Sequence, residues 1–172
     1  MDQDLAQLSE RIGCACRNTG VIVATAESCT GGWVAEVITH TSGSSGWFDC
    51  GFITYTNAAK AAMLGVRLNT IEACGAVSLE TAGEMAQGAL KHSSATISVA
   101  ITGIAGPTGG SPDKPVGTVC FGWCDHDEEG RVGTAYCERR LFLGDRESIR
   151  KQSAIHALSG LLDMIERARN MP

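Results

Sequence analysis

The sequence has few positive charges and no long apolar run, and each shortage excludes a class of protein. Lys and Arg number 14 against 19 Asp and Glu, and no basic patch occurs, whereas nucleic-acid phosphates are bound by clustered Lys and Arg. No apolar segment approaches the ~20 residues that cross a bilayer. The first residues, Met1-Asp2-Gln3-Asp4, are acidic where a secretory signal is basic. We therefore expect a cytoplasmic protein that binds neither nucleic acid nor membrane.

Metal-binding cysteine patterns are also missing, although the chain has eight cysteines. Neither a Cys-x2-Cys pair nor a nearby pair of histidines accompanies Cys14-x-Cys16 or Cys120-x3-Cys124, and zinc sites depend on such spacings. Disulfides are not expected in a reducing compartment, or in a chain long enough to bury a full core. We predict that most of the cysteines are small core residues, and that the protein uses no metal and no cofactor.

What the sequence does contain is typical of a folded α/β protein. Hydrophobic residues make up 44% of the chain and the mean hydropathy is +0.02, which fits a single globular domain over residues 1–172. Apolar spacing and turn signals separate the helices from the strands. The predicted helices are 4–18, 31–40, 58–64, 78–91 and one that begins after Asp145, with a single helical turn at 70–74. The predicted strands are 21–26, 50–56, 95–102, 116–124 and 132–142.

This order of elements predicts the architecture. Strands separated by helices pair in parallel, and the last two strands, joined by the polar turn 125–131, form an antiparallel hairpin. We therefore expect an α/β fold of three layers, α/β/α, in which a mixed sheet is covered by helices on both faces. Asn57 is the expected N-cap of helix 58–64, which places Lys60 in its first turn.

A glycine-rich loop follows the strand predicted at 95–102. Residues 103–114 include Gly103, Gly106 and Gly109 and end at Lys114. Glycine lets backbone N–H groups approach an anion closely, and a lysine adds positive charge. The loop is neither a Walker A motif nor a dinucleotide fingerprint, because no Gly-Lys-Ser/Thr follows and the next element is a strand. We predict a contact with a phosphate or a ribose, and the alternative is a plain linker.

Two turns rich in hydroxyl groups lie within residues 21–60, each beside a predicted strand. The first is Glu27-Ser28-Cys29-Thr30-Gly31-Gly32 and the second is Gly43-Ser44-Ser45-Gly46. A helix that begins near Thr30 points its free N–H groups toward Ser28 and toward a bound anion. Such turns gather a nucleophile and hydrogen-bond donors at one edge of a sheet, although two purely structural turns would show the same pattern.

Lys60 is the only evident base near Ser28 and Ser45. A free lysine has a pKa of ~10.4, so a half-neutral side chain at pH 7 needs a fall of ~3.4 units, or ~4.6 kcal/mol. Burial against apolar groups supplies several units, and the positive end of a helix acts in the same direction. Tyr55, at the end of the preceding strand, is placed to relay a proton or to hold the lysine. The alternative is an exposed Lys60 that only begins a helix.

Cys29 offers a different nucleophile, because a thiol at a helix start can have a low pKa. No histidine is placed by the sequence to activate it, so a cysteine hydrolase is the weaker hypothesis. A further alternative is a module that binds a pyridine nucleotide, or another phosphate ligand, without turning it over. A neutral lysine is needed by the enzyme and not by the binding module.

Five motifs occur in order along nearly the whole chain. They are Thr25-Ala-Glu-Ser-Cys-Thr-Gly-Gly32, Gly43-Ser-Ser-x-x-Phe48, Gly51-Phe-Ile-Thr-Tyr55-x-Asn57-x-x-Lys60, Gly75-Ala-Val-Ser78 and Thr102-Gly-Ile-Ala-Gly-Pro-x-Gly-Gly110 with Lys114-Pro-Val-Gly117. Together they closely resemble the CinA C-terminal domain family. The chain looks like the stand-alone form of that family, with no fused N-terminal domain.

The resemblance implies hydrolysis of the carboxamide of nicotinamide mononucleotide to nicotinate mononucleotide and ammonia, in pyridine nucleotide recycling, by a serine–lysine mechanism without metal. A serine attacks the carboxamide carbon, Lys60 carries the proton to the leaving nitrogen, and Tyr55 with backbone N–H groups stabilises the oxyanion. Which serine attacks stays open. The strand-to-helix turn favours Ser28 by analogy with nucleophile elbows, and the resemblance favours Ser45, the other serine then orienting the substrate.

The remaining expectations concern the nucleotide and the partner. We assign nucleotide contacts to Glu27, Thr30, Gly31, Thr102, Gly103, Gly106, Gly109 and Arg146. Trp47 and Phe48 are expected to be exposed beside the second turn, as an interface or as a substrate wall. We expect a homodimer, because small cytoplasmic enzymes commonly pair. The alternative function that the family suggests is a non-catalytic nucleotide-binding module of the competence/damage-inducible type.

Overall fold

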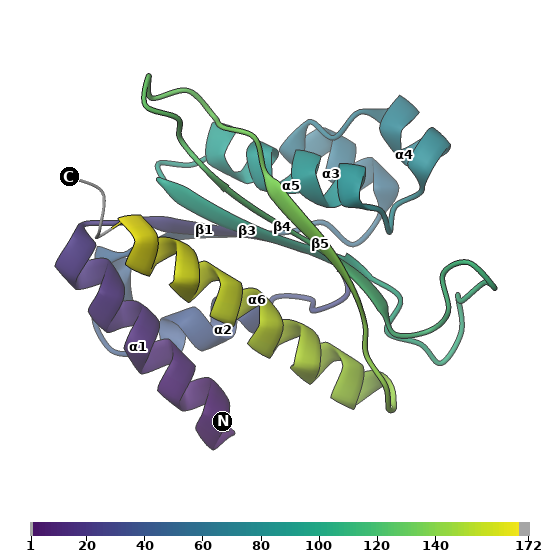
Figure 1. The fold of residues 1–172 in the computed structure, drawn as a ribbon, viewed down its shortest axis with the longest axis horizontal. Coiled ribbons are helices and arrows are strands. Elements are labelled where there is room, and N and C mark those ends of the chain that lie inside the picture. Colours follow the sequence, from purple (N-terminus) through teal and green to yellow (C-terminus); the bar gives the residue numbers. More distant parts are fainter. Residues whose placement is uncertain (1, 169–172) are drawn as a thin grey trace.

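The computed structural model describes residues 2–168, whose strands form one five-stranded mixed sheet (Figure 1). The strands are β1 (Val23–Glu27), β2 (Phe48–Ile53), β3 (Ile97–Gly103), β4 (Thr118–Asp125) and β5 (Tyr136–Leu141). They lie in the order β2-β1-β3-β4-β5. β1 pairs in parallel with β2 and β3, and β4 pairs antiparallel with β3 and β5. Residues 1 and 169–172 of the expected single domain lie outside the described residues.

Helices cover both faces of this sheet (Figure 1). One face carries α1 (Gln3–Thr19), α2 (Trp33–His40) and α6 (Arg146–Ala168), and the other carries α3 (Asn57–Leu64), α4 (Leu68–Cys74) and α5 (Leu79–Lys91). A short 3-10 helix, η1 (Ser44–Gly46), precedes β2. The predicted α/β fold, with its mixed sheet between two helical layers, is therefore confirmed.

The helical layer of α3 and α5 lies close to the sheet because small residues face it. Ala24 and Ala26 of β1 and Ala100 of β3 are fully buried in the same apolar cluster as Met85 and other residues of α5. Gly88 of α5 is in contact with α3, because a Cβ there would collide with the carbonyl group of Leu64. This close packing fixes α3, and with it Lys60, against the parallel half of the sheet.

Helix caps account for several of the boundaries. Asp145 caps α6 as predicted, because its Oδ1 accepts from the N–H of Ser148 at 2.8 Å. The N-cap of α3 is Thr56, whose Oγ1 accepts from the N–H of Ala59 at 3.1 Å, so the prediction that Asn57 is the cap was wrong. Asn57 is instead the first helical residue, and Thr56 has the extended backbone that a cap requires.

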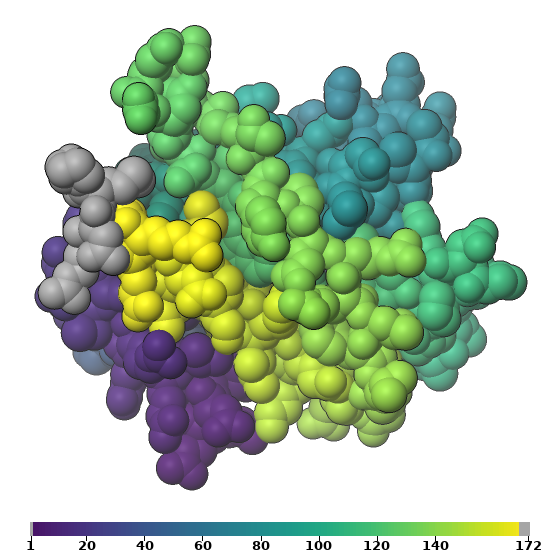
Figure 2. Space-filling view, viewed as in Figure 1, coloured from purple at the N-terminus to yellow at the C-terminus, as the bar shows by residue number. Residues whose placement is uncertain are grey.

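The last strand is shorter than predicted, because the residues directly after the polar turn do not pair continuously with β4. Oδ1 of Asp127 accepts from the N–H groups of Glu129 and Arg131, at 3.0 and 2.8 Å. After this turn Val132 forms only an isolated bridge with His126, and β5 starts at Tyr136 and not near residue 132. In Figure 2 this turn and the loop 104–117 project from the body of the molecule.

Trp47 is buried, so the expectation of an exposed side chain beside the second turn was wrong. Only 2% of Trp47 is exposed. Its ring packs on α1 at Gly13, where an added Cβ would lie 2.8 Å from the ring. The guanidinium of Arg17 covers the ring, 4.9 Å from its centroid. Phe48 is half-buried in the same apolar cluster.

Candidate active site

The carboxyl ends of β1 and β3 meet where the chain leaves these two neighbouring parallel strands in different directions. After β1 the chain continues into α2 and returns to β2, whereas after β3 the loop 104–117 leads to β4 on the other side. Open α/β sheets bind ligands at such a divergence. Ser28 directly follows β1 at this point, and its N–H donates to the carbonyl of Ile101 in β3 at 2.9 Å.

Lys60 and Ser28 are in direct contact at this edge. Nζ of Lys60 lies 3.0 Å from Oγ of Ser28 and 2.8 Å from the carbonyl oxygen of Thr54, to which it donates. Lys60 is 1% exposed and Ser28 8% exposed. The contact joins three separate elements, since Ser28 follows β1, Thr54 follows β2 and Lys60 belongs to α3.

Burial shifts the ionisation of Lys60 toward the neutral amine. Removing the ammonium from water lowers the pKa of Lys60 below its ordinary value, and a nearby Cys29 thiolate would oppose this shift. Within residues 2–168, no carboxylate forms a salt bridge with Lys60. A buried, unpaired lysine favours the neutral amine, which is the form that accepts a proton from a hydroxyl.

Ser45 lies at the opposite end of the sheet. It belongs to η1, which precedes β2, whereas Thr54 and Ser28 follow the carboxyl ends of β2 and β1. The six residues of β2 separate the two ends by about 20 Å at a rise of ~3.3 Å per residue. Ser45 is exposed, and the structure does not bring it to Lys60. The second turn precedes β2 at its amino end, whereas Lys60 follows β2 at its carboxyl end.

Tyr55 lies beside the site, but it is hydrogen-bonded to Arg146 and not to Lys60, the partner that was predicted. Its hydroxyl accepts from Nη2 of Arg146 at 2.9 Å, and no hydrogen bond links it to Lys60 in the part of the chain described. Arg146 also donates through Nη1 to the carbonyl of Gly106 at 2.7 Å. Arg146 therefore connects the end of β2 with the loop 104–117.

Glu27 was predicted to contact the nucleotide, but in the structure its carboxylate binds the main chain of the protein. Its carboxylate is 1% exposed and accepts from the N–H groups of Gly32, Val34 and Ala35 at 3.0, 3.1 and 2.8 Å. These are the orphan donors of the first turn of α2. Both carboxylate oxygens are used within the protein, so Glu27 caps α2 and holds the turn that contains Ser28.

The glycines and Thr102 at the end of β3 are packed against other parts of the protein. Oγ1 of Thr102 donates to the carbonyl of Ala76 at 2.8 Å. A Cβ on Gly103 would lie 3.1 Å from Sγ of Cys29, so glycine lets β3 and the turn after β1 approach each other. Gly109 is exposed in the loop, with φ of +92°. Contacts of this loop with a nucleotide stay a prediction.

Cys29 is unsuited to act as a nucleophile. Burial raises the pKa of its thiol to about 12, and the side chain is packed between the turn and the end of β3. A thiol of this kind is not ionised at neutral pH, which argues against the cysteine hydrolase hypothesis. Among residues 2–168, no group of three or more His, Cys, Asp or Glu side chains is arranged to hold a metal ion.

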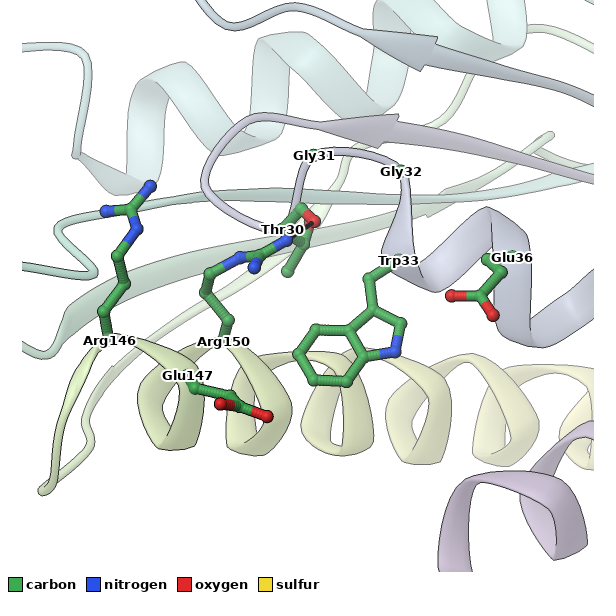
Figure 3. Close-up of a pocket in the computed structure, with 8 residues that line it drawn as sticks. All are labelled: Thr30, Gly31, Gly32, Trp33, Glu36, Arg146, Glu147 and Arg150. Carbon is green, nitrogen blue, oxygen red and sulfur yellow. Dashed lines mark hydrogen bonds between the residues drawn. The ribbon is translucent and has the colours of Figure 1, made fainter. Parts of the chain in front are cut away.

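A cleft of about 600 Å³ adjoins the turn after Ser28 (Figure 3). It is lined by Thr30, Gly31, Gly32, Trp33, Glu36, Arg146, Glu147 and Arg150. Figure 3 shows Arg146 and Arg150 extending from α6 on the side of the turn, with Trp33 next to Arg150. Thr30, Gly31 and Arg146 were predicted from the sequence, whereas Trp33 and Arg150 were missed. The spacing of four between Arg146 and Arg150, which puts both on one face of a helix, was the available signal.

Comparison with known proteins identifies the family. The model of the CinA C-terminal domain matches residues 5–165. Nicotinamide-nucleotide amidohydrolase PncC of Escherichia coli K12 is 52% identical over 160 residues, 93% of this chain and 94% of that protein. PncC of Pseudomonas putida is 47% identical, with 93% and 96% covered. The crystal structure of the competence/damage inducible protein CihA from Agrobacterium tumefaciens has a TM-score of 0.87 at 44% identity, with 95% and 97% covered. The chain therefore belongs to the CinA C-terminal domain family.

Proposed function

We propose that the protein is an amidohydrolase that converts nicotinamide mononucleotide to nicotinate mononucleotide and ammonia. Relatives named nicotinamide-nucleotide amidohydrolase, 47% and 52% identical over 93% of the chain, support this substrate. The observation that carries the chemistry is the 3.0 Å contact between the buried Lys60 amine and the Ser28 hydroxyl. We place the reaction in pyridine nucleotide recycling in the cytoplasm.

Ser28 is the proposed nucleophile and Lys60 its base. A neutral lysine has two N–H groups and one lone pair. Donation of one N–H to the carbonyl of Thr54 leaves the lone pair free to accept the proton of Ser28. Thr54 therefore orients the amine, and Lys60 removes the proton as Oγ of Ser28 attacks the carboxamide carbon.

The reaction then proceeds through an acyl-enzyme. The carbonyl electron pair moves to the oxygen as the Oγ–C bond forms, and the C–N bond breaks as protonated Lys60 returns its proton to the leaving nitrogen. Ammonia departs and leaves nicotinate mononucleotide esterified to Ser28. Lys60, again neutral, takes a proton from water as the water attacks the ester. The C–Oγ bond then breaks, Lys60 returns this proton to Oγ of Ser28, and the product is released.

The chemistry of the substrate suits the surroundings of the dyad. Its phosphate is an anion, and Arg146 lies at the exposed side of the cleft with guanidinium donors beyond the two that it uses inside the protein. Its pyridinium ring is a cation, which close to Lys60 would disfavour the ammonium further. We propose that the phosphate lies toward Arg146 and the carboxamide toward Ser28.

The test is the release of ammonia from nicotinamide mononucleotide by the purified protein, with chelator present. Wild type should turn over, and Ser28→Ala and Lys60→Ala should lose about 10⁴-fold or more of kcat, because removing one member disables a concerted pair. Ser45→Ala is the matched control, since it also replaces a serine in a glycine-rich turn, and it should remain active.

Two results would contradict the proposal. Full activity in Ser28→Ala with loss in Ser45→Ala would return the role of nucleophile to Ser45. No ammonia from wild type, together with a melting temperature raised by the nucleotide, would favour the non-catalytic binding module. Lys60→Arg separates the same two hypotheses, because a binding module should keep its affinity and an enzyme should lose turnover.

A further inference from the structure

Arg150 reaches from α6 to the main chain of the turn that follows Ser28. Its Nε donates to the carbonyl of Cys29 at 3.1 Å and its Nη2 to the carbonyl of Thr30 at 2.8 Å. The guanidinium also lies over the ring of Trp33, 5.3 Å from the centroid. Two hydrogen bonds and one stacking contact fix a planar group that is rigid in itself. Arg150 thus holds two consecutive carbonyl groups of the turn in defined directions.

The N–H groups of the same turn fall into two sets. Those of Ser28 and Gly31 are bonded to the carbonyls of Ile101 and Ser28, and that of Gly32 to the Glu27 carboxylate. The N–H groups of Cys29 and Thr30 have no main-chain acceptor among residues 2–168. Two consecutive free donors directly after a nucleophile form a site for a negative oxygen.

The carbonyls that Arg150 binds determine where one of these donors points. The carbonyl of Cys29 and the N–H of Thr30 belong to one peptide unit, and in a trans peptide the two groups point in opposite directions. A guanidinium on the carbonyl side therefore directs the N–H of Thr30 away from Arg150. The positive charge also polarises this peptide unit, which makes its N–H a stronger donor.

We propose that Arg150 is a positioning residue that aims the N–H group of Thr30, next to the N–H group of Cys29, at the oxyanion formed when Ser28 attacks the carboxamide. This inference rests on the proposed function. The oxyanion arises as the Oγ–C bond forms and the carbonyl electron pair moves to oxygen, and it disappears when that pair returns and ammonia leaves. Arg150 itself touches the turn, and Lys60 carries the proton.

The competing role for Arg150 is direct binding of the substrate phosphate, because its side chain also lines the cleft. The two roles affect different quantities. An interaction made only in the transition state changes kcat, whereas an anchor for the phosphate changes binding of the ground state as well. The split between kcat and substrate affinity therefore distinguishes them.

The experiment compares wild type, Arg150→Ala, Arg150→Lys and Arg17→Ala. Arg150→Ala should lower kcat by about 10²–10³-fold, as loss of oxyanion donors does, and leave KM within about threefold. Arg150→Lys keeps the positive charge and the aliphatic part of the side chain but loses the planar guanidinium. Its kcat should therefore lie between those of Arg150→Ala and wild type. Arg17→Ala is the control, because Arg17 makes the equivalent stacking contact with Trp47 outside the site, and it should keep the kcat of wild type.

Affinity is measured in the absence of turnover. The Kd of nicotinamide mononucleotide for Ser28→Ala should stay the same when Arg150→Ala is added. A Kd weakened tenfold or more, or a kcat unchanged in both Arg150 variants, would overturn the positioning role alone. Absence of turnover in wild type and in Arg17→Ala would overturn the proposed function, and this inference with it.

Discussion

Replacement of Glu27 tests whether its carboxylate belongs to α2 or to a ligand. Glu27→Ala removes an acceptor that is 1% exposed and receives three backbone N–H bonds of 2.8–3.1 Å. The N–H groups of Val34 and its neighbours in the first turn of α2 would then be left without acceptors in a largely buried position.

The magnitude follows from the bonds lost. Hydrogen bonds to a charged group are worth about 1.5–3 kcal/mol each, and this sum is reduced because the variant no longer buries a carboxylate. Removal of one partner of a buried charged interaction typically lowers the free energy of unfolding by about 3–5 kcal/mol. At about 2–4 °C per kcal/mol for a chain of this size, Glu27→Ala should lower Tm by about 6–20 °C. Glu27→Gln, which presents an NH₂ group to these donors, should also destabilise, by about 2–4 kcal/mol.

Urea unfolding and thermal melting at pH 7 measure this change, with Glu36→Ala as the control. Glu36 is another carboxylate in the first turn of α2, but it is exposed, so its removal should change stability by about 0.5 kcal/mol or less. If Glu27→Ala melts like wild type and only its KM for the nucleotide rises, Glu27 is a ligand contact and the capping argument is wrong.

Three further predictions concern ionisation and assembly. Because burial lowers the pKa of Lys60 below 10.5, folding at neutral and lower pH costs free energy, either to bury the ammonium or to release its proton. Lys60→Met should therefore raise Tm there, with the gain shrinking as the pH rises from the lowered pKa toward 10.5, and an equal gain at all pH values would contradict this. Because the pKa of Cys29 is raised to about 12, iodoacetamide at pH 8 should leave Cys29 unlabelled in the folded protein by mass spectrometry, and Cys29→Ala should keep turning over. The expected homodimer stays a prediction, which light scattering after size-exclusion chromatography checks: it should give twice the mass of one chain, and the mass of one chain would refute it.

The fold and the position of Lys60 were predictable because they depend on local pattern. Apolar periodicity separates helices from strands, and alternation of the two kinds of element implies parallel pairing. Lys60 follows from the same pattern, since it lies one turn after a strand that ends near Ile53. Its contact with Ser28 then requires only that the carboxyl ends of parallel neighbours share one edge.

Two of the misses, Trp47 and Arg150, depend on contacts distant in sequence, whereas the place of Ser45 follows from the order of elements along the chain. Ser45 stands in a turn of the right composition, but at the amino end of its strand. Trp47 looks exposed until α1 packs over it through Gly13. Arg150 is 121 residues from Cys29, whose carbonyl it binds. Composition and spacing give the kind of side chain present, and only the folded chain determines which side chains meet.

The order of strands in the sheet has a consequence for the way the protein forms. The contacts that bring β1 beside β3 begin with Ile22 and Thr96, the residues just before the two strands, which are 74 positions apart. Closing so long a loop delays pairing. Because β2 precedes β3 in the chain, we expect β1 to pair with β2 while its other edge is still open. Ser28 is held by Ile101 of β3, so we expect catalytic competence to appear late in folding, after much of the helix content. Recovery of amidase activity should accordingly lag behind the far-ultraviolet circular dichroism signal when the denatured protein refolds.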